Sequence, residues 1–159
     1  MKLQYWDCVL EDMAHAEAAT CAAATAGGNY GVAQEKFKVK SKCNANDETL
    51  AKIKKWWTDG AKKQTNQEQV ADNDNFSNMA NAASIGFACT YQYCSGELNS
   101  VCFYNEKLPG VGANLYEPGQ NGKYCDNCKQ LGGGAKAPCV DALCQVPFEQ
   151  RELSSNILS

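Results

Sequence analysis

Residues 75–89 read NFSNMANAASIGFAC, and the spacing of their apolar residues changes halfway along the stretch. The apolar positions of the first half lie at the spacing of one helix face; they are Phe76, Met79, Ala80 and Ala83. From Ile85 onwards the period is two, which is typical of a strand. One strand face would carry Ile85, Phe87, Cys89, Tyr91 and Tyr93, and the other Gly86, Ala88, Thr90 and Gln92. A helix followed directly by a strand predicts helices packed on a sheet.

The flanking sequence extends this pattern in both directions. Residues 95–99, SGELN, predict a turn into a second strand at 101–104, VCFY, and so a hairpin. Two earlier segments have residues at helical spacing: Leu10, Met13, Ala14, Ala18 and Cys21 in one, and Leu50, Ile53, Trp57 and Ala61 in the other. After Pro109 the sequence is rich in glycine, proline, asparagine and cysteine, which predicts an irregular tail. The expected fold class is therefore α+β, with a small antiparallel sheet layered against helices and a disulfide-rich tail.

Composition limits the partners of the protein. The chain has 159 residues, enough for one domain with its own core. Its net charge is −3 and its pI about 5.2, so neither nucleic acid nor an anionic membrane is expected as the main partner. No apolar run reaches the length of a membrane span. The first residues, MKLQYWD, contain no apolar signal core, which predicts a mature or truncated form of a longer chain.

Cysteine content decides the expected compartment. The ten cysteines are Cys8, Cys21, Cys43, Cys89, Cys94, Cys102, Cys125, Cys128, Cys139 and Cys144. An even number spread over most of the chain favours disulfides, and therefore a secreted, extracellular protein. The spacing of the last four would also suit a zinc site, but the six other cysteines make disulfides the favoured interpretation. The pairing cannot be deduced from spacing.

The sequence offers little for catalysis. Nucleophilic mechanisms need a serine or a free thiol beside a base, and His15 is the only histidine in the chain. No pair of carboxylates stands out from ordinary solvated charges. We therefore expect no catalytic residue, no cofactor and no enzymatic activity.

Two motifs resemble those of a known family. Residues 5–21, with YWDCVLE followed by Ala14, Ala18 and Cys21, are similar to the "YDCxLExxAxxxAxxC" helix of the CAP superfamily. That superfamily includes the cysteine-rich secretory, antigen five and pathogenesis-related-one proteins. The segment 101–119 is similar to its "VCxYxxxGNxxGxxLYxxG" signature, and the terminal cysteines resemble nematode activation-associated, venom allergen-like secreted proteins of the Ancylostoma type. The resemblance implies an α-β-α sandwich, with a CAP domain over 1–118 and a cysteine-rich extension over 119–159.

The resemblance also shows where this chain differs from the family. In the family, two histidines and two acids in a cleft are proposed to bind a divalent metal. The histidine of the family's "HYTQ" motif falls on Asn75, its tryptophan on Asn81, and the acid of "GENIY" on Val32. Only Asp59 fills one of the four metal-binding roles. A lone aspartate and an amide do not hold a metal tightly, so the resemblance predicts a degenerate cleft without metal.

Two further expectations concern the surface. Asn75-Phe76-Ser77 fits the N-glycosylation pattern, and a glycan on Asn75 would lie at the mouth of the cleft. The family's first helix, with its "HNxxR" motif, has no counterpart in this sequence. Without it we expect exposed apolar surface.

The resulting functional hypothesis is a secreted, non-enzymatic effector of a parasitic nematode. It would bind a host protein or cell-surface receptor and modulate immunity or haemostasis. The alternative is a sterol or fatty-acid carrier, in which residues 108–112, Trp56 and Tyr104 could line a groove, although a core role is the favoured interpretation for them. A metal-dependent hydrolase is a third hypothesis, which the missing histidines oppose.

Overall fold

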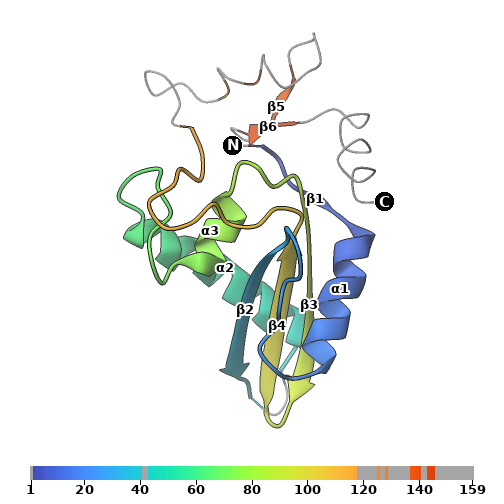
Figure 1. Cartoon of the computed structure of the whole chain (residues 1–159). Helices are drawn as coiled ribbons and strands as arrows, with labels where there is room; N and C mark the ends of the chain where they lie inside the picture. The colour runs from blue at the N-terminus through green and yellow to red at the C-terminus, as the bar shows by residue number, and fades with distance from the viewer. Residues whose placement is uncertain are drawn as a thin grey trace.

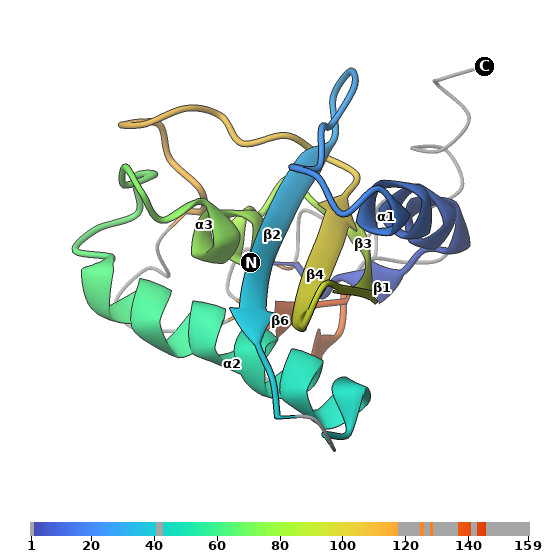
Figure 2. The ribbon, with the colours of Figure 1, turned by 90° about the horizontal axis from the view of Figure 1, so that it is seen from below.

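A central sheet lies between two layers of helix. The computed structural model describes residues 2–40, 43–117, 125, 128, 137–140 and 143–145. Helix α1 (Cys8–Ala19) covers one face of the sheet, and helices α2 (Ala45–Lys63) and α3 (Asp74–Ala80) cover the other, as Figures 1 and 2 show. The predicted α+β sandwich is therefore confirmed.

The sheet contains four strands in the order β1-β3-β4-β2. They are β1 (Tyr5–Trp6), β2 (Gly31–Lys38), β3 (Gly86–Cys94) and β4 (Glu97–Tyr104). β1 pairs with β3 in parallel and the other pairs are antiparallel. Cys94 lies opposite Glu97, so the β3–β4 hairpin turns on Ser95 and Gly96 alone, both with positive φ. This two-residue turn is shorter than the predicted turn at 95–99.

Each face of the sheet has its own apolar cluster. Leu10, Ala14 and Ala18 of α1 pack on alternate residues of β3 and β4. Trp56 of α2 and Met79 of α3 pack on the opposite face against Ala33, Cys102 and Tyr104. The alternation predicted for β3 places Ala88 in the first cluster and Phe87 beside the second, as expected.

Helix α1 begins at a clear cap. The side chain of Asp7 accepts hydrogen bonds from the backbone N–H groups of Val9 and Leu10, at 2.8 and 3.3 Å. The small side chains of Ala14 and Ala18 let the helix approach the sheet closely, and both are fully buried.

The buried face of α2 differs by one residue from the predicted apolar stripe. Thr49, Trp56 and Gly60 point inward, whereas Leu50 is 52% exposed and Trp57 40% exposed. The shift follows from the close packing of α3 against Gly60, where a Cβ would lie 2.1 Å from the Cβ of Phe76. Only glycine fits at that contact, so the helix must turn this face inward.

Eight of the ten cysteines form disulfides. Cys21–Cys94 joins the end of α1 to the end of β3, and Cys89–Cys102 crosses β3 and β4. Cys125–Cys139 and Cys128–Cys144 cross-link the tail, where the short strands β5 (Cys139–Val140) and β6 (Leu143–Cys144) pair.

The expectation that all ten cysteines form disulfides is wrong for Cys8 and Cys43, which are free. Cys8 begins α1 on one side of the sheet and Cys43 precedes α2 on the other. A disulfide needs Cα atoms within about 7 Å, which this separation across the sheet does not provide.

No helix in the described part of the chain is long and apolar enough to cross a membrane. Single apolar side chains are exposed on the surface, including Trp6 at 52%, Val9 at 66% and Tyr93 at 58% exposure.

Candidate functional site

A cavity of about 400 Å³ lies between α2, α3 and the outer strand β2. Its lining is mostly charged and polar: Glu35, Lys52, Lys55, Trp56, Asp59, Gly60, Lys63, Asp72, Asn73, Asp74, Asn75 and Phe76. Two of the predicted cleft residues, Asp59 and Asn75, are among them. The pocket therefore contains part of the position where the family resemblance predicts a cleft.

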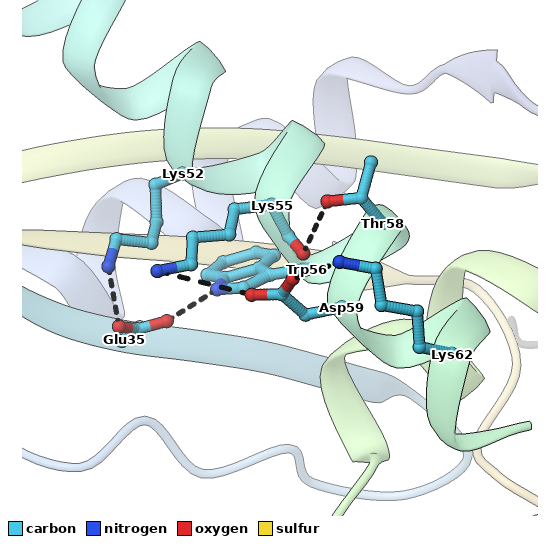
Figure 3. A network of polar contacts seen from close by, with 7 residues as sticks. All are labelled: Glu35, Lys52, Lys55, Trp56, Thr58, Asp59 and Lys62. Atoms are coloured by element: carbon cyan, nitrogen blue, oxygen red, sulfur yellow. Dashed lines mark hydrogen bonds and ion pairs between the residues drawn. The ribbon is translucent and has the colours of Figure 1, made fainter.

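Glu35 is one of the acids that line this pocket, and Figure 3 shows its polar contacts. One carboxylate oxygen lies 2.7 Å from the Nζ of Lys52, and the other accepts a hydrogen bond of 2.6 Å from the Nε1 of Trp56. Burial acts to raise the pKa of Glu35, but these two hydrogen bonds and the charges of Lys52 and Lys55 outweigh it and lower the pKa. Glu35 is therefore ionised at neutral pH, with both oxygens engaged.

Asp59 has weaker partners at the rim of the pocket. Its carboxylate lies 3.9 Å from the Nζ of Lys55 and 3.5 Å from that of Lys62, and all three side chains are largely exposed (Figure 3). Exposed pairs of this kind contribute little to stability. Asp59 stays in the solvent as an ordinary surface acid.

Both ends of the Asn75 amide are hydrogen-bonded to the backbone of β2. Its Oδ1 accepts a hydrogen bond from the backbone N–H of Gln34 at 3.2 Å, and its Nδ2 donates to the carbonyl of Gln34 at 3.3 Å. Three residues along α3, Asn78 donates from Nδ2 to the carbonyl of Val32 at 2.9 Å. These asparagines thus satisfy backbone groups of β2 on the side away from β4, as a further strand would.

The other two predicted cleft positions lie elsewhere. Val32 packs against the cluster beneath α1, on the opposite face of the sheet. Asn81 is buried after α3, where it donates to the carbonyl of Lys107 and accepts from the N–H of Ala83. The structure therefore brings Asp59 and Asn75 to one pocket and does not bring Val32 or Asn81 there.

Sequence reasoning missed Glu35 as a pocket residue, because residues 36–42 next to it alternate lysine with other residues, a pattern typical of an exposed strand. The period of two along β2 contains the signal. Ala33 faces the layer of α2 and α3, so Glu35, two residues later, faces it too.

The geometry at the glycosylation motif is restrictive. Asn75 is half-buried with both ends of its amide engaged, and the hydroxyl of Ser77 is fully buried. A glycan on Asn75 would have to lie beside Gln34 within this packed contact. The glycan is therefore a prediction of the sequence motif alone, and the packed contact favours an unmodified Asn75.

The residues present do not fit the divalent metal of the family's cleft. The pocket lining contains no histidine, since His15 is exposed on α1 in the other layer. Glu35 is already neutralised by Lys52, and Asn75 has both amide ends on Gln34. Among the described residues, the one group of side chains close enough to hold a metal is Cys125, Cys128 and Cys144, whose sulfurs are in disulfides.

Comparison with known proteins identifies the family. The sequence model of the CAP, or cysteine-rich secretory protein, family matches residues 1–104. This chain belongs to the CAP family. No curated protein sequence matches it. The matched residues run from the N-terminal segment to the end of β4, so the family's pattern coincides with the layered sheet.

Solved structures share this fold, among them Na-ASP-1, the hookworm platelet inhibitor and NaASP2. Na-ASP-1 is 25% identical with a TM-score of 0.70, and the alignment covers 92% of this chain and 37% of that one. This chain thus spans little more than a third of Na-ASP-1. The hookworm platelet inhibitor is 24% identical with a TM-score of 0.69, and the alignment covers 92% of this chain and 77% of that one. NaASP2, solved with Zn²⁺, is 20% identical with a TM-score of 0.67, and the alignment covers 91% of this chain and 76% of that one. The resemblance to nematode activation-associated secreted proteins is thereby confirmed.

Proposed function

We propose that this CAP protein acts outside the cell as a non-enzymatic effector that binds a host protein or cell-surface receptor. Membership of a family of cysteine-rich secretory proteins and four disulfides support an extracellular site of action. The similarity to secreted proteins of parasitic nematodes supports a role in the host.

The engagement of Glu35 carries the non-enzymatic part of the proposal. A general base works best when its pKa lies near the working pH, and the partners of Glu35 move its pKa in the opposite direction. Both oxygens are also occupied, by Lys52 and by Trp56. The residue at the family's histidine position, Asn75, is an amide that does not titrate and is bonded to the sheet.

Cell binding tests this proposal. The oxidised protein, labelled with a fluorophore, is incubated with host leukocytes and platelets, with and without an excess of unlabelled protein. We expect saturable binding that is lost when the cells are first treated with protease, and that is unchanged by chelator or Zn²⁺. Hydrolytic activity that depends on an added divalent metal would refute the non-enzymatic role.

The carrier alternative gains no specific support from the residues predicted to line its groove. Trp56 and Tyr104 are 6% and 2% exposed and belong to the core beneath α2 and α3. Leu108 packs against Phe76 and Leu115. Saturable micromolar binding of cholesterol or palmitate would nevertheless favour it over the effector.

A further inference from the structure

The two edges of the sheet differ in how their outward backbone groups are occupied. On the β2 edge, Asn75 and Asn78 of α3 occupy backbone groups of Gln34 and Val32, and Lys36 and Lys38 follow along the strand. Such caps and charges discourage the addition of another strand.

The β3 edge has a neighbour over only its first two residues. Tyr5 pairs with Gly86 and Trp6 with Phe87, after which the chain leaves at Asp7 to begin α1. From Ala88 to Cys94, no strand lies on the outer side of β3 in the described part of the chain. The sequence of β3, GFACTYQYC, contains no charged residue.

The printed hydrogen bonds show which backbone groups of β3 point outward. The N–H of Asp7 donates to the carbonyl of Phe87 at 3.0 Å, whereas the carbonyl of Gly86 is used on the β4 side by the N–H of Asn105. Because the direction alternates along a strand, Cys89, Tyr91 and Tyr93 also direct their N–H and C=O groups away from β4.

The Cys89–Cys102 disulfide supports this assignment independently. The two residues lie directly opposite each other, with Cα atoms 4.0 Å apart. Such a short separation is typical of the narrow, non-hydrogen-bonded pair of an antiparallel ladder. Neither residue of such a pair turns its backbone groups toward the other, so those of Cys89 face the open edge.

These outward groups are nearly free among the residues that the structure describes. The one hydrogen bond to them is a long contact of 3.5 Å from the side chain of Gln92 to the carbonyl of Tyr93. On the face opposite α1, the edge has an aromatic row in which Tyr91 is 36% exposed and Tyr93 58% exposed, with Trp6 at its head. The edge therefore combines unused backbone groups with accessible apolar side chains.

We propose that the edge of β3 from Cys89 to Tyr93 binds an extended segment of a partner protein, which adds to the sheet in line with β1. The backbone of the segment would form hydrogen bonds with the outward N–H and C=O groups of Cys89, Tyr91 and Tyr93. Its alternate side chains would face Tyr91 and Tyr93, which favours β-branched or aromatic residues there. The remaining side chains would lie on the α1 side, where small uncharged residues fit. This surface on β3 is separate from the pocket between α2, α3 and β2.

A second copy of this chain fits the edge less well. Figure 2 shows α1 over the β3 end of the sheet, and α1 packs on Ala88 of β3. Two β3 strands brought side by side would therefore bring the two α1 helices against each other. A single extended segment has no such helix and occupies the position that β1 leaves at Asp7.

Amide hydrogen exchange of the native, oxidised protein tests the proposal. The probe is a library of seven-residue peptides that alternate threonine with valine, isoleucine, tyrosine or phenylalanine. In the free protein, the amides of Tyr91 and Tyr93 should exchange fast, while those of Thr90 and Gln92 are protected by β4. The library should slow the fast pair at least tenfold.

The matched control is the same library with an N-methyl group on every residue, which removes the backbone donors of both peptide edges. It should give no protection. Equal protection by both libraries would show aromatic adhesion alone and overturn the proposal. Slow exchange of Tyr91 and Tyr93 in the free protein, absence of protection by the library, or protection that rises with protein concentration alone would also overturn it.

A pair of variants locates the surface. Tyr93→Lys places a charge on the edge at a largely exposed position and should weaken peptide binding at least tenfold. Trp57→Lys changes another exposed aromatic residue, on α2, and should leave peptide binding unchanged; an equal loss in both would contradict the assignment. If Tyr93→Lys loses peptide binding but keeps host-cell binding, the edge stands and the host partner uses another surface.

Discussion

Replacing Gly60 by alanine should destabilise the protein by about 2 kcal/mol, although propensity alone predicts the opposite sign. In the interior of a helix, alanine is more favourable than glycine by about 1 kcal/mol. At Gly60 the new Cβ would lie 2.1 Å from the Cβ of Phe76, 2.6 Å from its Cγ and 2.9 Å from the Oδ1 of Asn73. Ordinary carbon contacts are about 3.5–4 Å, so α2 and α3 would have to separate by more than an ångström.

The magnitude follows from these two opposing effects. Overpacking of a well-packed contact costs about 1–3 kcal/mol, and an overlap with fixed Cβ and Cγ atoms belongs at the upper end of that range. Subtracting the propensity gain of about 1 kcal/mol leaves a loss of about 2 kcal/mol. Separation of the helices would also lengthen the hydrogen bond from Asn73 to the carbonyl of Gly60, now 3.1 Å.

Urea unfolding with the disulfides intact measures the effect. With a slope of about 2 kcal/mol per molar, the midpoint should fall by roughly 1 M. Ala61→Gly is the matched control, since Ala61 is exposed on the next position of α2 and should lose about 1 kcal/mol from propensity alone. A midpoint for Gly60→Ala that is unchanged or higher would refute the packing argument.

Further predictions concern charge, cross-links, metal and glycan. Because the pKa of Glu35 is lowered in the folded state, the stability that its ionised form contributes is present above its ordinary pKa near 4.5 and is lost as the pH falls through the folded value. Wild type should therefore exceed Glu35→Gln in urea midpoint at pH 7, with the difference vanishing in acid; a constant difference would contradict this. Loop-closure entropy gives about 4.4 kcal/mol for Cys21–Cys94, which spans 73 residues, and about 2.9 kcal/mol for Cys89–Cys102, which spans 13. Replacing both cysteines of the first pair by serine should thus lower the thermal midpoint more than replacing those of the second, and equal losses would count against the estimate. Titration calorimetry with Zn²⁺ should show no binding to the oxidised protein. One tight site would contradict the conclusion that the pocket residues do not fit a divalent metal. Mass spectrometry of the native protein should find the Asn75 peptide unmodified, and a glycan there would mean that the contact with Gln34 is rearranged.

The fold was predictable where local pattern and tertiary packing agree. Leu10, Ala14 and Ala18 are apolar, helical in spacing and buried, and the alternation of β3 matches its two faces. The phase of α2 was not predictable, because two of its inward residues, Thr49 and Gly60, have no apolar side chain to mark them. Gly60 faces inward only because Phe76, distant in sequence, packs on it.

The candidate site shows the same division. Its position between α2, α3 and β2 follows from the family motifs, which led to Asp59 and Asn75. Glu35 could be found from the alternation of β2, but its engagement depends on Lys52 and Trp56, which only the folded chain brings near. The free state of Cys8 and Cys43 likewise depends on which side of the sheet each one occupies.

The Cys21–Cys94 cross-link has a consequence for proteolysis of this protein. It joins residues on either side of β2, α2 and α3, so every exposed connection between these elements lies within one covalent loop. A single cut in the loop at 64–73, at the rim of the pocket, would leave both fragments tied together and still layered on the sheet. The nicked molecule would keep its mass, apart from one added water, until a reductant releases the pieces. Cleavage at this loop would then change the pocket rim alone and leave the rest of the molecule joined together.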